Sequence, residues 1–349
     1  MGKHIFMEFT QKQTDIAKGE AVCLMFAHHL FNFPSRLVDG NTYVQVLPFL
    51  NLEATLGAFG KICVAIFLFL SGYGIFLGYL RAKKPPANYV FKKFKDLYLT
   101  YWLYFLIFVP IGIFFFKDAT LMNSQELRYS TEPFNLIGNF LGFRSTYNEE
   151  WWFIRLFLTM LAVSPIYLKL TQRNPILTVF LSLFIFSLNL KLDKLIDFQF
   201  CFWQISLALG MVCAKVNFFS SDLIKELEKM GAIGVTATLL ICFLIRHQFG
   251  EGCDFLLVPF FIYASIRAAT LLKLAPVFSW LGQYSFPLWL VHSFFCYYYF
   301  QPIVYGLKWS PLVFLTLMTL SLISVLAIEY FRGYILRFRA GGLRGLPTR

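Results

Sequence analysis

The sequence contains few charged residues for its length. Charged side chains make up 14% of the 349 residues and hydrophobic ones 58%, with aromatic residues alone at 19%. Soluble domains carry about 25% charged residues, and a soluble surface with so few charges would expose large apolar patches. The low charge excludes a soluble globular protein, and the high apolar content excludes a disordered chain. The composition therefore predicts an integral membrane protein.

Several motifs that mark common functions are absent. The seven cysteines form no CxxC and no Cys/His spacing typical of zinc sites, so we expect neither a metal centre nor a disulfide framework. The chain has no Walker loop and no GxGxxG, which argues against ATP-driven transport and dinucleotide chemistry. We expect no nucleic-acid partner, because the basic residues do not form a soluble basic domain.

Long apolar segments dominate the remaining sequence. A bilayer needs about 20 mainly apolar residues per helix, and runs such as ILTVFLSLFIFSLNL lack the alternation of barrel strands. The predicted fold is an all-α integral membrane bundle of about ten transmembrane helices over residues 1–335, followed by an unstructured cytoplasmic tail, 336–349. The candidate helices lie near 16–33, 57–80, 97–116, 151–170, 175–190, 200–217, 231–246, 254–272, 277–300 and 308–331.

The basic residues predict how the chain is oriented. With a cytoplasmic N-terminus, 21 of the 31 Lys and Arg residues fall on the cytoplasmic side, as the positive-inside rule requires. An even number of helices then places both termini inside. The net charge of +12 is mainly a topology signal and an attraction to anionic membrane lipid.

The first predicted span, IAKGEAVCLMFAHHLFNF, carries polar residues that lipid makes costly. Lys18 and His29 are eleven residues apart, so they lie within about 20° of one helix face and ~16 Å apart along its axis. Imidazole moves protons near neutral pH, which favours a functional His29. In the alternative interpretation, Lys18 reaches the headgroups and His28 and His29 hydrogen-bond within the bundle.

The second span and the loop after it have two interpretations each. Ser71, Gly72, Gly74 and Gly78 allow close approach of either a ligand or a neighbouring helix. The loop 81–95 carries six basic residues, which either enforce topology or bind a phosphorylated cytoplasmic ligand.

The predicted outer side carries acidic and aromatic residues together. The loop 117–150 ends in Glu149 and Glu150, directly before Trp151 and Trp152. Carboxylates beside indole rings suggest sugar recognition, although tryptophans also form interfacial belts and Arg155 needs a counter-charge. In the ninth span, Ser285 and His292 are seven residues apart and share a face; His292 alone is as consistent with a hydrogen-bonded bundle histidine.

The order of these features resembles the membrane acyltransferase-3 family, whose bacterial members O-acylate surface polysaccharides. The resemblance extends from residue 18 to residue 292. The chain departs from the family at Lys18, Lys93 and Lys95, where the family usually has arginine. It rests on Lys18 with His29, Phe69-Leu70-Ser71-Gly72-Tyr73, Lys92-Lys93-x-Lys95 before Tyr98 and Tyr101-Trp102, Trp151-Trp152-Phe153, and the pattern from Leu281 to His292.

The resemblance implies a multi-pass enzyme of the bacterial inner membrane that moves an acyl group, acetyl being expected, from cytoplasmic acyl-CoA to a hydroxyl of a lipid-linked or cell-surface glycan. Acyl-CoA is then a co-substrate, and no permanently bound cofactor is expected. His29 is the implied catalytic base or acylated nucleophile. The implied donor-binding residues are Lys18, Ser71, Tyr73, Lys92, Lys93 and Lys95, and the implied acceptor-binding residues are Glu149, Glu150, Trp151, Trp152, Ser285 and His292.

Two other function classes share part of this pattern. A lipid-linked oligosaccharide flippase or polymerase would have the same basic inner loops and aromatic outer side. A sensor or scaffold would leave a buried His29 without a purpose. Binding of acetyl-CoA separates the acyltransferase from both.

Overall fold

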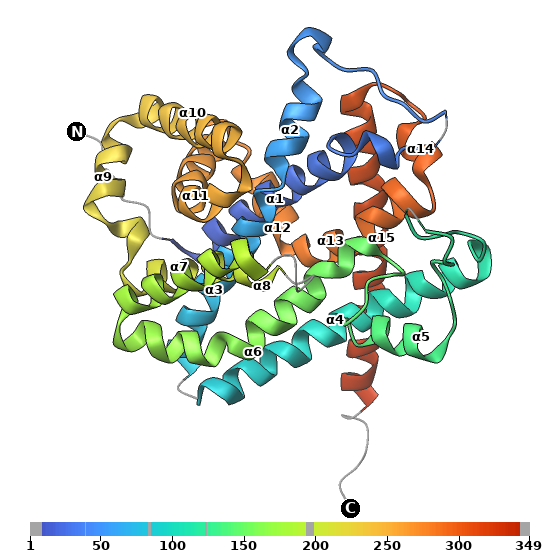
Figure 1. The fold of residues 1–349 in the computed structure, drawn as a ribbon, viewed down its shortest axis with the longest axis horizontal. Helices are drawn as coiled ribbons and strands as arrows, with labels where there is room; N and C mark the ends of the chain where they lie inside the picture. The colour runs from blue at the N-terminus through green and yellow to red at the C-terminus, as the bar shows by residue number, and fades with distance from the viewer. Residues whose placement is uncertain (1–8, 39, 83–84, 123, 193–198, 343–349) are drawn as a thin grey trace, which may run out of the picture.

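The computed structural model describes residues 9–38, 40–82, 85–122, 124–192 and 199–342. These residues are almost entirely helical, as the apolar runs predict (Figure 1). The α-helices are α1 (Gln11–Phe31), α2 (Leu52–Gly60), α3 (Cys63–Ala82), α4 (Pro86–Phe115), α5 (Pro133–Phe140), α6 (Trp152–Arg173), α7 (Pro175–Leu192), α8 (Phe200–Lys215), α9 (Asp222–Lys229), α10 (Gly231–Phe249), α11 (Asp254–Leu271), α12 (Ala275–Gln283), α13 (Ser285–Ser293), α14 (Gln301–Tyr305) and α15 (Ser310–Gly342).

Five helical segments of the described chain are long and apolar enough to cross a membrane. They are Leu52–Ala82, Pro86–Phe115, Glu149–Arg173, Gly231–Leu271 and Ser310–Ile335. Two shorter apolar helices, Pro175–Leu188 and Phe200–Lys215, occupy two further predicted spans. The all-α membrane fold is therefore confirmed, while the count of ten spans and the location of the termini stay predictions.

The ninth predicted span, 277–300, is divided into shorter helices. The break falls at Tyr284, between α12 and α13, and a π-helix, Phe294–Tyr298, follows α13. Pro287 explains the break, because proline has no N–H to donate to the carbonyl of Gln283. The predicted tail, 336–349, begins inside α15, and its last part, 343–349, lies outside the described residues.

Helix α1 lies at the centre of the bundle. It packs against α2, α3, α12 and α13, and Figure 1 shows α4 and α6 side by side, away from the pair α10 and α11. Helices α3 and α8 also pack closely, and two glycines allow this. A Cβ at Gly72 would collide with the backbone oxygen of Leu207, and a Cβ at Gly210 would collide with that of Phe69. Gly72 therefore serves helix packing, one of the two interpretations of its motif.

Candidate functional site

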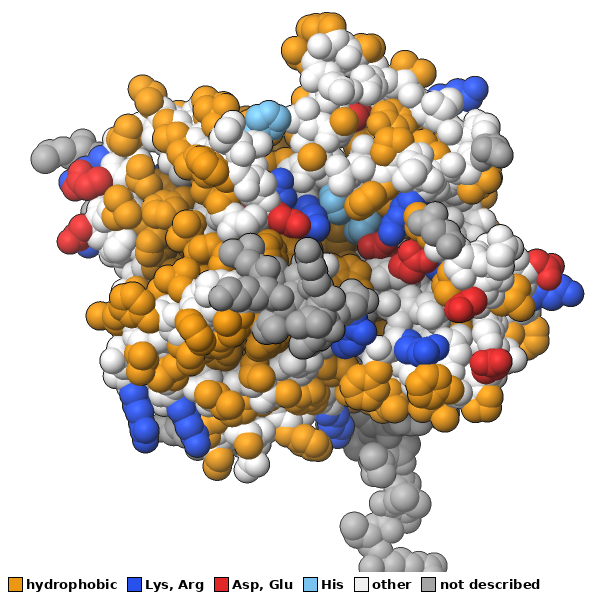
Figure 2. Space-filling view, viewed as in Figure 1, with side chains coloured by type: hydrophobic (Ala, Val, Ile, Leu, Met, Phe, Trp, Pro, Cys, Tyr) orange, Lys and Arg blue, Asp and Glu red, His pale blue; other side chains and the backbone are white. Residues whose placement is uncertain are grey.

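A cavity of about 900 Å³ connects most of the residues that the sequence singles out. Its walls come from α1, α3, α4, α6 and α13. On the face drawn in Figure 2, basic, acidic and histidine side chains gather around a hollow in a mostly hydrophobic surface. The donor-binding, catalytic and acceptor-binding residues predicted from the sequence that line the cavity are Lys18, His29, Ser71, Tyr73, Lys93, Glu149, Glu150, Trp152 and Ser285.

One end of the cavity is basic. Lys18 of α1, Arg81 of α3 and Lys93 of α4 all line it. Lys18 lies 3.8 Å from Asp15, and the ammonium of Lys93 lies 5.7 Å from the centre of the Tyr89 ring. Asp96 of α4 lines the cavity as well, and the three cations outweigh its charge and suit a phosphorylated ligand. Lys92 and Lys95, the other predicted donor-binding residues, are exposed and do not line the cavity.

Small residues of α3 and aromatic residues of α6 also line the cavity. The small residues are Ser71, Gly74 and Gly78, and the aromatic residues are Phe153 and Phe157. A Cβ at Gly74 would meet no atom within 4 Å. Gly74 therefore serves the cavity, the second interpretation of the glycine motif, whereas Gly72 serves helix packing. Gly78 lines the cavity but also packs closely on the hydroxyl of Tyr89.

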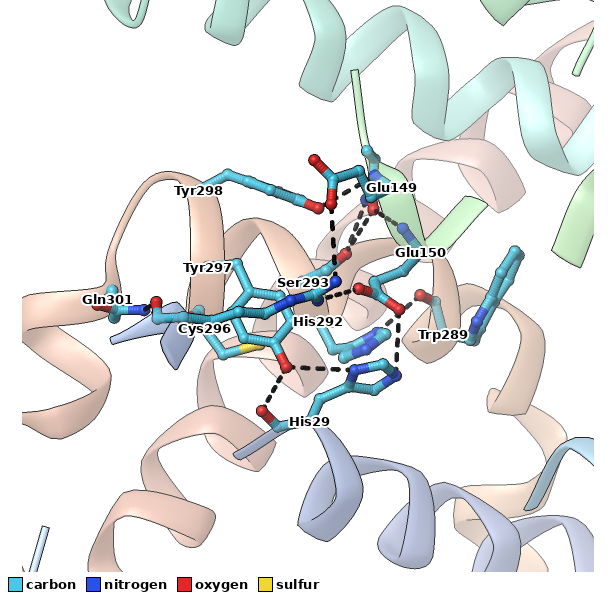
Figure 3. Close-up of polar contacts among 12 residues, drawn as sticks. His29, Glu149, Glu150, Trp289, His292, Ser293, Cys296, Tyr297, Tyr298 and Gln301 are labelled. Atoms are coloured by element: carbon cyan, nitrogen blue, oxygen red, sulfur yellow. Dashed lines mark hydrogen bonds and ion pairs between the residues drawn. The ribbon is translucent and has the colours of Figure 1, made fainter. Parts of the chain in front are cut away.

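At the other end, His29 lies beside Glu150. Nε2 of His29 is 3.5 Å from Oε2 of Glu150, and both side chains are buried (Figure 3). His28 turns to α2 instead, where its Nδ1 lies 2.8 Å from the carbonyl oxygen of Gly57. Of the two histidines, His29 is therefore the one that meets the acidic residues.

Two arginines meet the carboxylates. Arg36 donates a hydrogen bond to Glu150 and lies 3.6 Å from Glu149, and Arg128 donates to Glu149 over 2.8 Å. Burial opposes the charge on Arg36, but the neighbouring Glu150 outweighs it and raises the pKa of the guanidinium above its usual value. Arg36 and Arg128 thus supply counter-charges to the two carboxylates.

Short turns after helices put these groups in place. Arg36 ends the 3₁₀ turn Pro34–Arg36 that follows α1, and its carbonyl accepts a hydrogen bond of 2.9 Å from Gln301. Glu150 lies in the turn Glu149–Trp151, and its N–H donates a hydrogen bond of 3.0 Å to the side-chain oxygen of Asn148. Asn148 is tied to Ser293 of α13 over 2.7 Å. The acidic turn is therefore anchored to the helix that lies next to His29.

Two predicted acceptor-binding residues lie behind the cavity wall. Trp151 is buried and donates from its indole nitrogen to the carbonyl of Leu290 over 3.1 Å. His292 is buried as well, with Nδ1 2.8 Å from the carbonyl oxygen of Trp289 and its ring centre 4.8 Å from that of His29. Neither residue lines the cavity. Both residues pack behind the side chains that line it.

The sequence did not single out Arg36, Arg128 or Tyr297 as site residues. Tyr297 contacts His29, and its ring centre lies 4.6 Å from the guanidinium carbon of Arg36. These contacts join segments that are far apart in the chain, so local sequence patterns do not predict them. The sequence indicated only that Arg36 and Arg128 are basic residues on the predicted outer side. Among the described residues, no cluster of three or more His, Cys, Asp or Glu side chains could hold a metal ion.

Comparison with known proteins gives one match. The family model described as an acyltransferase domain, Acyl_transf_3, matches residues 12–330 of the chain. Neither the curated proteins nor the solved structures contain a match. The matched range includes every residue of the cavity wall except Phe9, Thr10 and Gln11.

Proposed function

The chain belongs to the acyltransferase-3 family of membrane acyltransferases, and from this premise we propose that it moves an acyl group, acetyl being expected, from cytoplasmic acyl-CoA to a hydroxyl of a lipid-linked or cell-surface glycan. The observation that carries the proposal is the cavity, which has Lys18, Arg81 and Lys93 in one part and the buried His29–Glu150 pair, with Arg36, in another. A transferase needs such a connection when donor and acceptor lie on opposite sides of a membrane.

The basic end is the proposed donor site. Lys18, Arg81 and Lys93 would bind the phosphates of CoA, and the slender rest of the molecule would run past Ser71 and Gly74. Lys18 and His29 are ~16 Å apart along α1, so the thioester would reach His29 while the phosphates stay near the opening. The 21 basic residues on the predicted cytoplasmic side agree with this direction of entry.

His29 is the proposed general base. Its Nε2 takes the proton of the acceptor hydroxyl while that oxygen forms a bond to the acyl carbon. The bond from the acyl carbon to sulfur then breaks, and the departing sulfur takes the proton back from Nε2. The carboxylate of Glu150, 3.5 Å from Nε2, stabilises the positive charge that His29 carries between these two transfers.

The acidic and aromatic end is the proposed acceptor site. Glu149, Trp152 and Ser285 line the cavity there. The carboxylate and the hydroxyl would bind sugar hydroxyls, and the indole ring would stack on a sugar face. In this proposal the enzyme is a multi-pass protein of the bacterial inner membrane with this end facing outward.

Two measurements test the proposed function. The purified protein in detergent should bind acetyl-CoA, and deletion of the gene should remove O-acetyl signals from the surface glycan of its host. Absence of both effects would contradict the proposal. A flippase or polymerase, which the family match does not favour, would instead change the amount or length of the glycan and leave its acetylation per sugar intact.

A further inference from the structure

The π-helix Phe294–Tyr298 presents two tyrosines to the acidic turn and to α1. It is closed by a wide-turn hydrogen bond from the N–H of Tyr299 to the carbonyl of Phe294, of 2.7 Å. The hydroxyl of Tyr298 accepts a hydrogen bond of 3.0 Å from the N–H of Glu149, while Tyr297 reaches His29 (Figure 3). Such π-turns inside helical segments occur frequently at functional sites.

The Tyr297 hydroxyl has two contacts with His29. It donates its proton to the backbone carbonyl oxygen of His29, and its oxygen lies 3.3 Å from Nδ1 of the same residue. A hydroxyl has only one proton to donate. Since the carbonyl takes that proton, the tyrosine oxygen can only accept at Nδ1, so Nδ1 carries the hydrogen.

This arrangement decides which imidazole nitrogen is free. In a neutral imidazole one nitrogen carries the hydrogen and the other accepts. With the hydrogen on Nδ1, the lone pair is on Nε2. The 3.5 Å between Nε2 and Oε2 of Glu150 exceeds the length of an ordinary N–H···O hydrogen bond, so this carboxylate does not hold a hydrogen on Nε2. The groups around the ring are the titratable side chains of Glu150, His28, His292 and Tyr297, the nearby charge of Arg36, and the ring of Phe33.

We infer that Tyr297 is a positioning residue, which holds the His29 imidazole with its hydrogen on Nδ1 and thereby keeps Nε2 free to take the acceptor proton. The inference deepens the proposed function and rests on it. Tyr297 acts through His29 and need not touch either substrate. The guanidinium of Arg36 lies over the face of the Tyr297 ring, 4.6 Å from its centre. Since Arg36 also donates to Glu150, the same arginine orients both Tyr297 and Glu150.

Tyr305 provides a matched control. Its hydroxyl donates to the carbonyl oxygen of Leu30 over 2.9 Å, one residue further along α1, and it is not among the residues that contact the His29 ring. Tyr297→Phe and Tyr305→Phe each remove one tyrosine bond to the end of α1. Only the first also removes the contact with Nδ1. A purely structural role would affect the two variants alike.

The kinetic test uses the full chain in liposomes with acetyl-CoA as donor and deacetylated host glycan as acceptor. Tyr297→Phe should lower kcat about tenfold or more, because part of the orientation of the base is lost, and should leave both KM values unchanged. Tyr305→Phe should stay within about twofold of the wild type. Equal losses in the two variants, or a Tyr297→Phe enzyme as fast as the wild type, would overturn the inference.

A spectroscopic test works without turnover. The full chain labelled with ¹⁵N-histidine in detergent should show His29, identified by the loss of its signals in His29→Gln, as the Nδ1-protonated form at about pH 8, where an ordinary imidazole is neutral. Tyr297→Phe should mix the two tautomers. An Nε2-protonated His29 in the wild type would overturn the inference. If His29 is protonated on Nδ1 but the protein transfers no acyl group, the result would contradict the proposed function and leave the role of Tyr297 in place.

Discussion

Nε2 of His29 lies 3.5 Å from Oε2 of Glu150, and both side chains are buried at one end of a cavity whose other end is basic. A buried carboxylate beside an imidazole stabilises the protonated ring. Glu150 in turn is bound by Arg36. The pair is therefore suited to accept a proton and to release it again.

The first prediction concerns Glu150. Glu150→Gln keeps the shape of the side chain but removes the charge that stabilises protonated His29, so kcat should fall about 100-fold, within the range that general acid–base groups contribute. Glu53→Gln is the control, because Glu53 is a buried carboxylate that lies outside the cavity and binds the N–H of Val46 and the hydroxyl of Ser310. The measurement is acetyl transfer at saturating substrate. Equal effects of the two variants would argue against a role in proton transfer.

The second prediction separates lysines of the basic segment. All three lysines are exposed, but only Lys93 lines the cavity, whereas Lys92 and Lys95 do not. Lys93→Ala should raise the KM for acetyl-CoA about tenfold, because hydrogen bonds to charged groups contribute about 1.5 kcal/mol or more. Lys95→Ala should change it little. A larger effect at Lys95 than at Lys93 would mean that the donor binds elsewhere.

The third prediction uses the two different glycines of α3. Gly74→Leu should fold normally, since a Cβ there meets no neighbour, but should block the cavity and lower kcat/KM for acetyl-CoA about tenfold or more. Gly72→Ala should instead lower the melting temperature, because it forces α3 away from α8 at a cost of about 1–3 kcal/mol. An active Gly74→Leu enzyme would show that the donor does not pass this point.

The fourth prediction distinguishes direct transfer from an acylated histidine. In the proposed mechanism His29 carries only a proton, so wild-type protein incubated with radiolabelled acetyl-CoA and no acceptor should retain no label after denaturation. The control is the same incubation with acceptor glycan, where label should appear in the glycan. Label that stays on the protein and is lost in His29→Ala would show covalent catalysis instead.

Local patterns in the sequence predicted the helices and part of the site. The apolar runs located the helical segments, and the spacing of Lys18 and His29 placed both on one face of α1, where both line the cavity. The same patterns could not separate Gly72 from Gly74, because the difference depends on which helix packs against α3.

The rest of the site depends on contacts between distant segments. Arg36 lies in a 3₁₀ turn and Tyr297 in a π-helix, and neither has a periodic pattern that would relate it to His29. Trp151 and His292 have the composition of site residues but point into the core. There Trp151 donates to the carbonyl of Leu290 and Nδ1 of His292 contacts the carbonyl of Trp289, while Nε2 of His292 has no hydrogen-bond partner among the described residues. Composition alone does not distinguish a cavity wall from the layer behind it.

The most direct test of the central claim is acetyl transfer by His29→Gln. Purified wild-type and variant proteins in liposomes would receive radiolabelled acetyl-CoA on the donor side and deacetylated host glycan on the other, with acetyl-CoA binding measured in parallel. The account predicts that the variant binds acetyl-CoA as the wild type does and loses transfer by at least about 100-fold. Transfer at the wild-type rate by a variant that binds acetyl-CoA normally would contradict it.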